Sequence, residues 1–166
     1  NGLSLRFREE QARSMGRTAA GVSGIKPVGD DVVVGLALVS DDNRLLVASA
    51  NGIGKRTPFA DYRAQTRGGK GIITMKVTEK TGEVVGAIAV EESDELMLMT
   101  TGGQSIRIRV SEVRETGRNA QGVKLVSLRG EEKLQDIAKV LAEAPSAPGD
   151  PESDSDASVD SSGEEE

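Results

Sequence analysis

Short apolar runs separated by turn residues dominate the hydrophobic pattern of this chain. Residues 32–39 and 44–49 form two such runs of strand length, and the Asp-Asp-Asn sequence at 41–43 between them is typical of a turn. That interruption argues against one continuous helix, because a helix would need apolar positions that keep a period of 3.6 residues. We therefore predict four short strands, at about residues 21–28, 32–39, 44–49 and 55–59, and an all-β fold.

The same pattern returns along the chain with a period of 50 or 51 residues. Residues 17–21 (RTAAG) align with 67–71 (RGGKG) and 118–122 (RNAQG), and the run at 35–39 returns at 86–90. Four strands in about fifty residues is the size of one propeller blade. We expect the glycine that ends each aligned segment to occupy a tight position where a Cβ would clash, with an ordinary turn glycine as the alternative.

The repeat is incomplete at both ends of the chain. The opening residues 3–8 match only the fourth strand of a unit, and the last unit supplies two strands that end near residue 140. We predict one folded domain over residues 1–143, made of the end of one blade, two complete blades and one partial blade. Because this partial ring is too short to close, we expect the chain to be a piece of a longer protein.

The net charge of −6 combines two segments of opposite character. Residues 1–143 carry all 21 Lys and Arg and 19 Asp and Glu, a net charge of +2, whereas residues 144–166 carry eight acids and no base, a net charge of −8. The second segment is rich in Pro, Ser and Gly and has little to bury, so we predict a disordered acidic tail. It either competes with a ligand for the basic surface or simply aids solubility.

Composition removes several kinds of chemistry. The chain has no Cys and no His, so it lacks disulfides, thiolate metal sites and the commonest general base. Acidic clusters such as Asp41-Asp42 lie at strand junctions and fit solvated turns better than metal ligands. Tyr62 aligns with Ala12 and Val113, so we expect it to pack in the interior. We predict a cytoplasmic protein whose chain holds no catalytic residue, metal, cofactor or membrane span.

Basic residues gather in three windows that follow the repeat. Thirteen of the 21 Lys and Arg lie in residues 6–17, 55–70 and 107–118, which contain only five acids. Nine arginines form three registers with the spacing of the repeat: the first is Arg6, Arg56 and Arg107, the second Arg13, Arg63 and Arg114, and the third Arg17, Arg67 and Arg118. Because equivalent positions of stacked repeats fall along one edge, we predict a basic stripe.

A regular basic stripe suits a ligand with regularly spaced negative charge. Duplex DNA carries one phosphate charge per ~1.7 Å of helix axis, and arginine binds phosphate oxygens through paired hydrogen bonds. The chain has only three aromatic residues, too few for the base stacking used in single-stranded and sequence-specific RNA binding. We therefore predict binding of double-stranded DNA through its backbone; for any one arginine taken alone, a solvated charge is the alternative.

The loop at residues 65–71 (QTRGGKG) resembles the box heptad Q-[RK]-R-G-G-[RK]-G of the C-terminal domain of the DNA gyrase A protein, with Thr66 in place of one basic residue. Residues 51–57 (NGIGKRT) are similar to later blades of that domain, and the resemblance covers about residues 1–143. It implies a β-pinwheel, a propeller-like ring whose rim wraps duplex DNA. The DNA-binding residues it implies are the nine arginines of the three registers with Lys55, Gln65, Gly68, Gly69, Lys70 and Gly71.

By this resemblance the chain is part of an ATP-hydrolysing type IIA topoisomerase that introduces negative supercoils. The catalytic tyrosine, the ATP and the magnesium would then lie elsewhere in the complex. The implied partners are duplex DNA, the rest of the gyrase A protein and the gyrase B protein in an A2B2 complex, at the bacterial nucleoid. Two alternatives remain: the C-terminal DNA-binding domain of the topoisomerase IV A protein, and a propeller-type protein-interaction scaffold. The box-like loop and the acidic tail favour gyrase.

Overall fold

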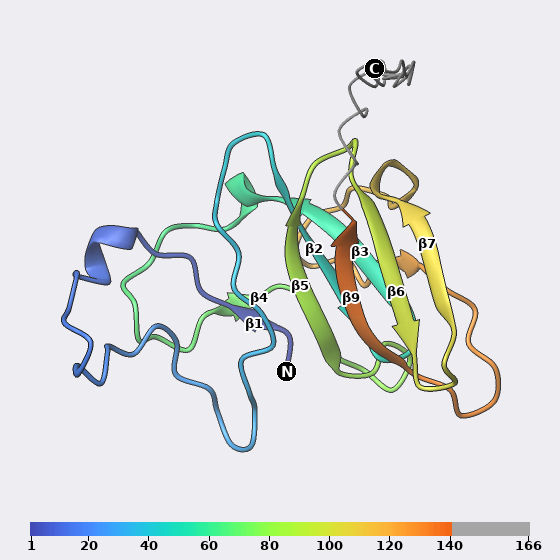
Figure 1. Ribbon diagram of the computed structural model, residues 1–166, viewed down its shortest axis with the longest axis horizontal. Coiled ribbons are helices and arrows are strands. Elements are labelled where there is room, and N and C mark those ends of the chain that lie inside the picture. The colour runs from blue at the N-terminus through green and yellow to red at the C-terminus, as the bar shows by residue number, and fades with distance from the viewer. Residues whose placement is uncertain (141–166) are drawn as a thin grey trace, which may run out of the picture.

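The chain folds into antiparallel β-sheets joined by long loops and short 3-10 turns (Figure 1). The computed structural model describes residues 1–140, and these contain no α-helix, which confirms the predicted all-β fold. Within this part of the chain no helix is long and apolar enough to cross a membrane. The acidic tail predicted at residues 144–166 lies outside the described residues.

The central four-stranded sheet takes its strands from three of the repeats. β2 (Arg44–Ser49) and β3 (Ile53–Pro58) form a hairpin, and β5 (Val84–Val90) and β8 (Val123–Lys124) pair with its two outer edges. Most of β2 is buried, on both faces of the sheet, which explains why its apolar run does not alternate with polar residues. The hairpin turns at Gly52, whose φ of +73° costs glycine little.

The second large sheet repeats this arrangement one unit further along the chain. β6 (Glu95–Thr100) forms a hairpin with β7 (Ser105–Arg109), and β9 (Leu134–Val140) pairs with the other edge of β6. The pairing of β9 with β6 copies that of β5 with β2, including a register shift near the end of the shared strand. A small separate sheet joins β1 (Leu3–Ser4) to β4 (Ile72–Ile73).

Each repeat therefore donates strands to other repeats. The second strand of a unit completes the sheet of the unit before it, as β5 does for β2 and β9 for β6. The short first strand pairs with the fourth strand two units before, as β4 does with β1 and β8 with β3. The units are thus held together by backbone hydrogen bonds as well as by packing, and they are not independent modules.

Two predicted strands of the first full unit, at 21–28 and 32–39, do not form; the first region has only a bridge from Ile25 to Gly69. The physical reason is the strand exchange, since their partners would be strands of earlier units, which do not occur among residues 1–140. The second region keeps its apolar pattern but is exposed, with Leu36 at 87% of full exposure. The other two predicted strands are confirmed as β2 and β3, although β3 begins earlier and ends one residue sooner.

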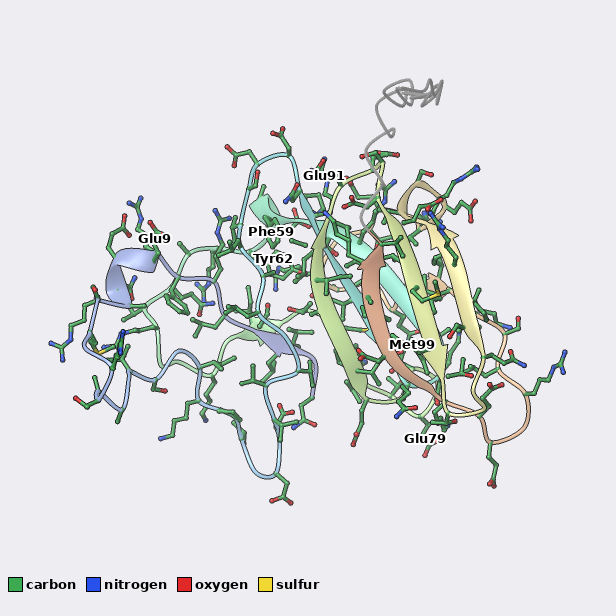
Figure 2. The ribbon with its side chains drawn as sticks, in the orientation of Figure 1. Glu9, Phe59, Tyr62, Glu79, Glu91 and Met99 are labelled. Atoms are coloured by element: carbon green, nitrogen blue, oxygen red, sulfur yellow. The ribbon has the colours of Figure 1, made fainter. Side chains whose placement is uncertain are left out.

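Two apolar clusters form the core. The larger joins the two large sheets and includes Leu46, Val90 and Ile137. The smaller surrounds Phe59 and Tyr62, whose ring centroids lie 6.4 Å apart beside β2 (Figure 2). Tyr62 is buried there, which confirms the packing role predicted for it.

The glycines before the first strands are confirmed as tight positions in two of the three units. Gly71 and Gly122 have φ of +84° and +99°, and a Cβ added to them would lie 2.9 Å and 2.8 Å from the carbonyl carbons of Ser4 and Gly54, and closer still to their oxygens. Gly21 has the same φ of +84°, but an added Cβ would meet nothing within 4 Å. The strand that would press against Gly21 does not occur among the described residues.

Candidate nucleic-acid interface

A 3-10 turn and an arginine-bearing loop follow every fourth strand. The turns are η1 (Glu9–Gln11), η2 (Phe59–Asp61) and η3 (Val110–Glu112), and they keep the spacing of the repeat. Each of these three short helices contains an acidic residue, and none ends with a basic residue. The arginines of the second and third registers therefore lie on the loops that leave these turns.

The loops that follow η2 and η3 run back along the fourth strand of the preceding unit. The backbone N–H of Gln65 donates to the carbonyl of Arg6 at 2.8 Å, and the equivalent N–H of Thr116 donates to the carbonyl of Arg56 at 2.9 Å. The side-chain amide nitrogen of Gln65 is buried and has no hydrogen-bond partner among the described residues. This packing fixes where each loop leaves the blade, so the backbone of the candidate interface is positioned by the neighbouring unit.

Two members of the first arginine register, Arg6 and Arg56, bind backbone carbonyls of the unit that follows. Nη1 of Arg6 donates to the carbonyls of Phe59 at 2.8 Å and of Tyr62 at 3.2 Å, in the next unit. Nε of Arg56 donates at 2.6 Å to the carbonyl of Val113, which is the repeat equivalent of Tyr62. Two successive units therefore use the same arginine as a bridge to the unit that follows.

Burial separates the members of this register. The side chain of Arg56 is only 9% exposed, and its Nη2 lies 3.2 Å from Oε1 of Glu92, whose pKa the guanidinium lowers. Arg107 is 57% exposed and pairs instead with Glu95 on β6. It has no carbonyl to bridge because no fourth strand of a further unit occurs among residues 1–140. Arg56 is thus not accessible to DNA in this structure, although the sequence placed it in the predicted site.

The third register also links units. Nη1 of Arg67 donates at 3.1 Å to the carbonyl of Ser23, and Nη1 of Arg118 donates at 2.9 Å to the carbonyl of Ile73, the equivalent residue one repeat later. Both side chains are half-buried. Arg17 is exposed, because the equivalent carbonyl would belong to an earlier unit. Two of these three arginines therefore already hold a protein oxygen.

The second register is the one that faces solvent throughout. Arg13, Arg63 and Arg114 are all exposed, and none has a hydrogen bond or ion pair to another described residue. They occupy equivalent positions of three successive units. Of the three predicted registers, this is the one that the structure leaves entirely available to a ligand.

Exposed basic residues beyond the predicted set add to this surface. Arg8 and Arg109 occupy equivalent positions at the ends of two fourth strands, and both are exposed. The sequence signal for them is weak because the third equivalent residue is Pro58. The predicted site therefore left out two arginines that are exposed in the structure.

The box-like loop is held by its backbone, and its lysine is free. The N–H of Gly68 donates to the carbonyl of Gly24, and the carbonyl of Gly69 accepts a 2.9 Å hydrogen bond from the N–H of Lys26. The φ of +77° at Gly68 favours glycine in this turn. Lys70 is exposed and has no partner in the described part of the chain. The glycines therefore shape the loop, and Lys70 is its side chain positioned for an anion.

Lys55 lies inside the molecule. It is fully buried, and its Nζ donates to the carbonyls of Gly117, at 2.9 Å, and of Arg118. Burial, with a smaller contribution from the charge of Arg118, lowers the pKa of Lys55 from 10.5 to about 8, and the charge of Asp61 opposes the shift. Lys55, which the sequence placed in the predicted DNA-binding set, is therefore not exposed at the surface in this structure. The described residues contain no cluster of three potential metal ligands.

The interlocked β-units, the turn and arginine loop that recur in each unit, and the repeated exposed guanidinium define a propeller-like repeat protein. The family model described as "DNA gyrase C-terminal domain, beta-propeller" matches residues 1–40, 43–91 and 94–140. The chain belongs to this family, as a β-pinwheel domain of the DNA gyrase A type. The predicted resemblance is confirmed.

Curated relatives and solved structures agree with this assignment. The chain is 49% identical over 128 residues to the DNA gyrase A protein of Helicobacter pylori and 40% identical over 175 residues to that of Escherichia coli K12; these matches cover 76% and 99% of the chain. The chain spans only 16% and 20% of those two proteins. A solved gyrase A C-terminal domain matches with a TM-score of 0.76 and 31% identity, covering 84% of this chain and 48% of that one. A topoisomerase IV C-terminal domain, at 24% identity and a TM-score of 0.78, shares the fold.

Proposed function

We propose that this domain binds duplex DNA along its basic edge and wraps it, in support of ATP-dependent negative supercoiling by a bacterial gyrase. The observation that carries the proposal is the second register, in which Arg13, Arg63 and Arg114 are exposed, unpaired among the described residues and equivalent by the repeat. The partners would be the remainder of the gyrase A protein and the gyrase B protein, and ATP and magnesium would act elsewhere in that complex. The site of action would be the nucleoid.

The contact set follows from the availability of each side chain. The DNA-contacting residues are the exposed basic residues at the loop end of the blades: Arg8, Arg13, Arg63, Lys70, Arg109 and Arg114. Arg6, Arg56, Arg67 and Arg118 support this surface from within, since each already holds a backbone carbonyl of another unit. Arg17 and Arg107 are exposed and extend the same edge.

Wrapping requires many modest contacts in a row. Bending 20–30 base pairs costs on the order of 1–6 kcal/mol, which repeated phosphate contacts offset better than one tight site does. If the six residues above each engage one phosphate, the logarithm of the binding constant falls with the logarithm of salt concentration at a slope of about −5. Because these contacts reach only the backbone, we expect little preference for DNA sequence.

The test compares two variants with the same change in net charge. Replacing Arg13, Arg63 and Arg114 together by alanine should reduce the salt slope by about 2 to 3. Replacing Lys76, Lys80 and Arg129, which are exposed outside the arginine loops, is the control and should leave the slope nearly unchanged. If the salt slope decreased equally in the two variants, only net charge would matter, and the proposal would be overturned.

Wrapping is separated from simple binding by a topology assay. Nicked circular DNA is ligated in the presence of the chain, and the linking number of the closed product is measured. A shift that grows with protein concentration supports wrapping. Binding without any shift would favour a mode of the topoisomerase IV kind, and no binding to linear duplex would favour a protein-interaction scaffold.

A further inference from the structure

Lys55 occupies a position that is apolar in the other units. By the 50- and 51-residue spacing its equivalents are Leu5 and Ile106. A fully buried ammonium group at this place costs desolvation free energy that a leucine or isoleucine would not. Because the other two units have an apolar residue at this position, the lysine points to a role beyond packing.

The ammonium of Lys55 anchors one turn of the candidate interface. Its hydrogen bonds go to the carbonyls of Gly117 and Arg118, and the N–H of Ala120 donates to the same Gly117 carbonyl at 3.2 Å. These residues form the turn 117–120 that follows the Arg114 loop. Asp61 on η2 and Arg118 on the turn are the charged groups that act on the ammonium.

The equivalent turn of the unit before is anchored in the opposite way. There the N–H of Arg67 donates to Oε1 of Gln11 at 3.0 Å, and the N–H of Gly68 donates to the carbonyl of Gly24. The N–H groups of that turn are consequently used up by protein acceptors. In the turn at 117–120 the corresponding N–H groups have no partner among residues 1–140.

Peptide geometry determines where those free N–H groups point. In a planar trans peptide the N–H is directed opposite to the C=O, and no cis peptide bond occurs among the described residues. Because Lys55 draws the carbonyls of Gly117 and Arg118 inward, the N–H groups of Arg118 and Asn119 point away from it. Two successive N–H groups turned outward form an anion-binding concavity.

We propose that the turn 117–120 binds a backbone phosphate of duplex DNA through the N–H groups of Arg118 and Asn119, with Lys55 as the buried residue that positions them. This inference rests on the DNA binding proposed above and names one of its contact points. Asp61 weakens phosphate binding at this turn, because its carboxylate lies near Gly117 and repels a phosphate. The buried positive charge of Lys55 offsets that repulsion from behind the turn.

The protonation of Lys55 gives the site a characteristic dependence on pH. Since its pKa is lowered to about 8, the ammonium loses its proton just above neutrality. DNA affinity should then fall as the pH rises through 8. The fold itself should become more stable over the same range, because a buried charge is removed. If Lys55 had a purely structural role, the stability of the fold would change over this pH range and the DNA affinity would not follow its protonation.

The experiment is a titration of the 17.4 kDa chain, labelled with nitrogen-15, with a short duplex of mixed sequence. The amide signals of Arg118 and Asn119 should shift on binding. In Lys55→Met those two shifts should be lost, and the affinity should fall about tenfold with no further decrease above pH 8. Leu5→Met, in the equivalent slot of another unit, is the matched control and should bind like the unchanged chain.

The outcomes separate this inference from the proposed function. Duplex binding in which the amides of Arg118 and Asn119 stay still, or in which Lys55→Met binds as tightly at pH 7, would overturn the phosphate site and leave DNA binding intact. Failure of the unchanged chain to bind any duplex would overturn both. The amide measurement on the unchanged chain decides the matter even if Lys55→Met does not fold.

Discussion

Alanine substitution at the glycines of the box-like loops tests whether these glycines serve strand exchange. Gly122 and Gly21 both have positive φ, +99° and +84°, a region that costs an L-residue roughly 1–2 kcal/mol. At Gly122 the added Cβ would also lie 2.8 Å from the carbonyl carbon of Gly54, whereas at Gly21 it would meet nothing within 4 Å. The pair of substitutions therefore separates backbone strain from steric clash.

The size of the clash follows from what must move. Gly122 precedes β8, which pairs with β3 through Gly54 and Val123. Relieving the contact requires the two backbones to separate, which weakens about two ladder hydrogen bonds at roughly 1 kcal/mol each. We expect Gly122→Ala to cost about 3–4 kcal/mol in the free energy of unfolding and Gly21→Ala about 1–2 kcal/mol, since only the former combines the two effects.

The assay is urea unfolding of each variant, with the slope of free energy against urea compared to confirm that the unfolded state is unchanged. Gly71→Ala provides a third point, because its Cβ would lie 2.9 Å from the carbonyl carbon of Ser4. Losses at Gly122 and Gly21 that agree within about 0.5 kcal/mol would refute the clash, because additive, independent effects are reproducible to that level. A loss of DNA affinity at Gly71→Ala without destabilisation would show that this glycine contacts DNA instead.

Two further predictions concern the buried basic residues. Arg56→Ala should lower the free energy of unfolding by about 2–4 kcal/mol, because it leaves the Val113 carbonyl without its donor. Arg107 is exposed, so Arg107→Ala should change the free energy of unfolding by less than about 0.5 kcal/mol. Thermal unfolding of both variants checks this, and equal losses of stability would contradict the bridging role. For Lys55, the folded pKa of about 8 lies below the unfolded value of 10.5, so the unfolded chain binds more protons between these values. Its unfolding free energy should rise by up to roughly 3 kcal/mol from pH 8 to 10.5, at 1.36 kcal/mol per pKa unit. Lys55→Met, measured by urea unfolding across that range, should lack this rise; a parallel rise in both proteins would refute the buried charge.

The division of the nine arginines changes how a repeated charge pattern is interpreted. All three registers keep the spacing of the repeat, yet only the second is exposed and unpaired in every unit that the structure describes. The first and third bridge two units wherever both units occur among residues 1–140, and Arg107 and Arg17 lack the second unit there. In an interlocked repeat protein, periodic arginines therefore serve cohesion and ligand binding together.

Several features of this protein were determined by local sequence alone. The fifty-residue period, the strand at residues 44–49, the existence of a strand near residues 55–59, the interior position of Tyr62 and the tight glycines at 71 and 122 all follow from patterns that repeat along the chain. Such patterns are visible in the sequence because strand length, turn chemistry and the need for glycine at positive φ depend on a few neighbouring residues.

The tertiary structure alone decided which strands pair with one another and which basic side chains point into the protein. The sequence predicted strands at 21–28 and 32–39, but a strand forms only where another strand supplies its hydrogen bonds, and those partners belong to other units. Likewise, no local pattern reveals that Arg56 and Lys55 turn inward to carbonyls 57 and 62 residues away. A basic side chain is available to DNA only if it is not already hydrogen-bonded to a backbone oxygen that is distant in the sequence. Such hydrogen bonds depend on how the blades pack together.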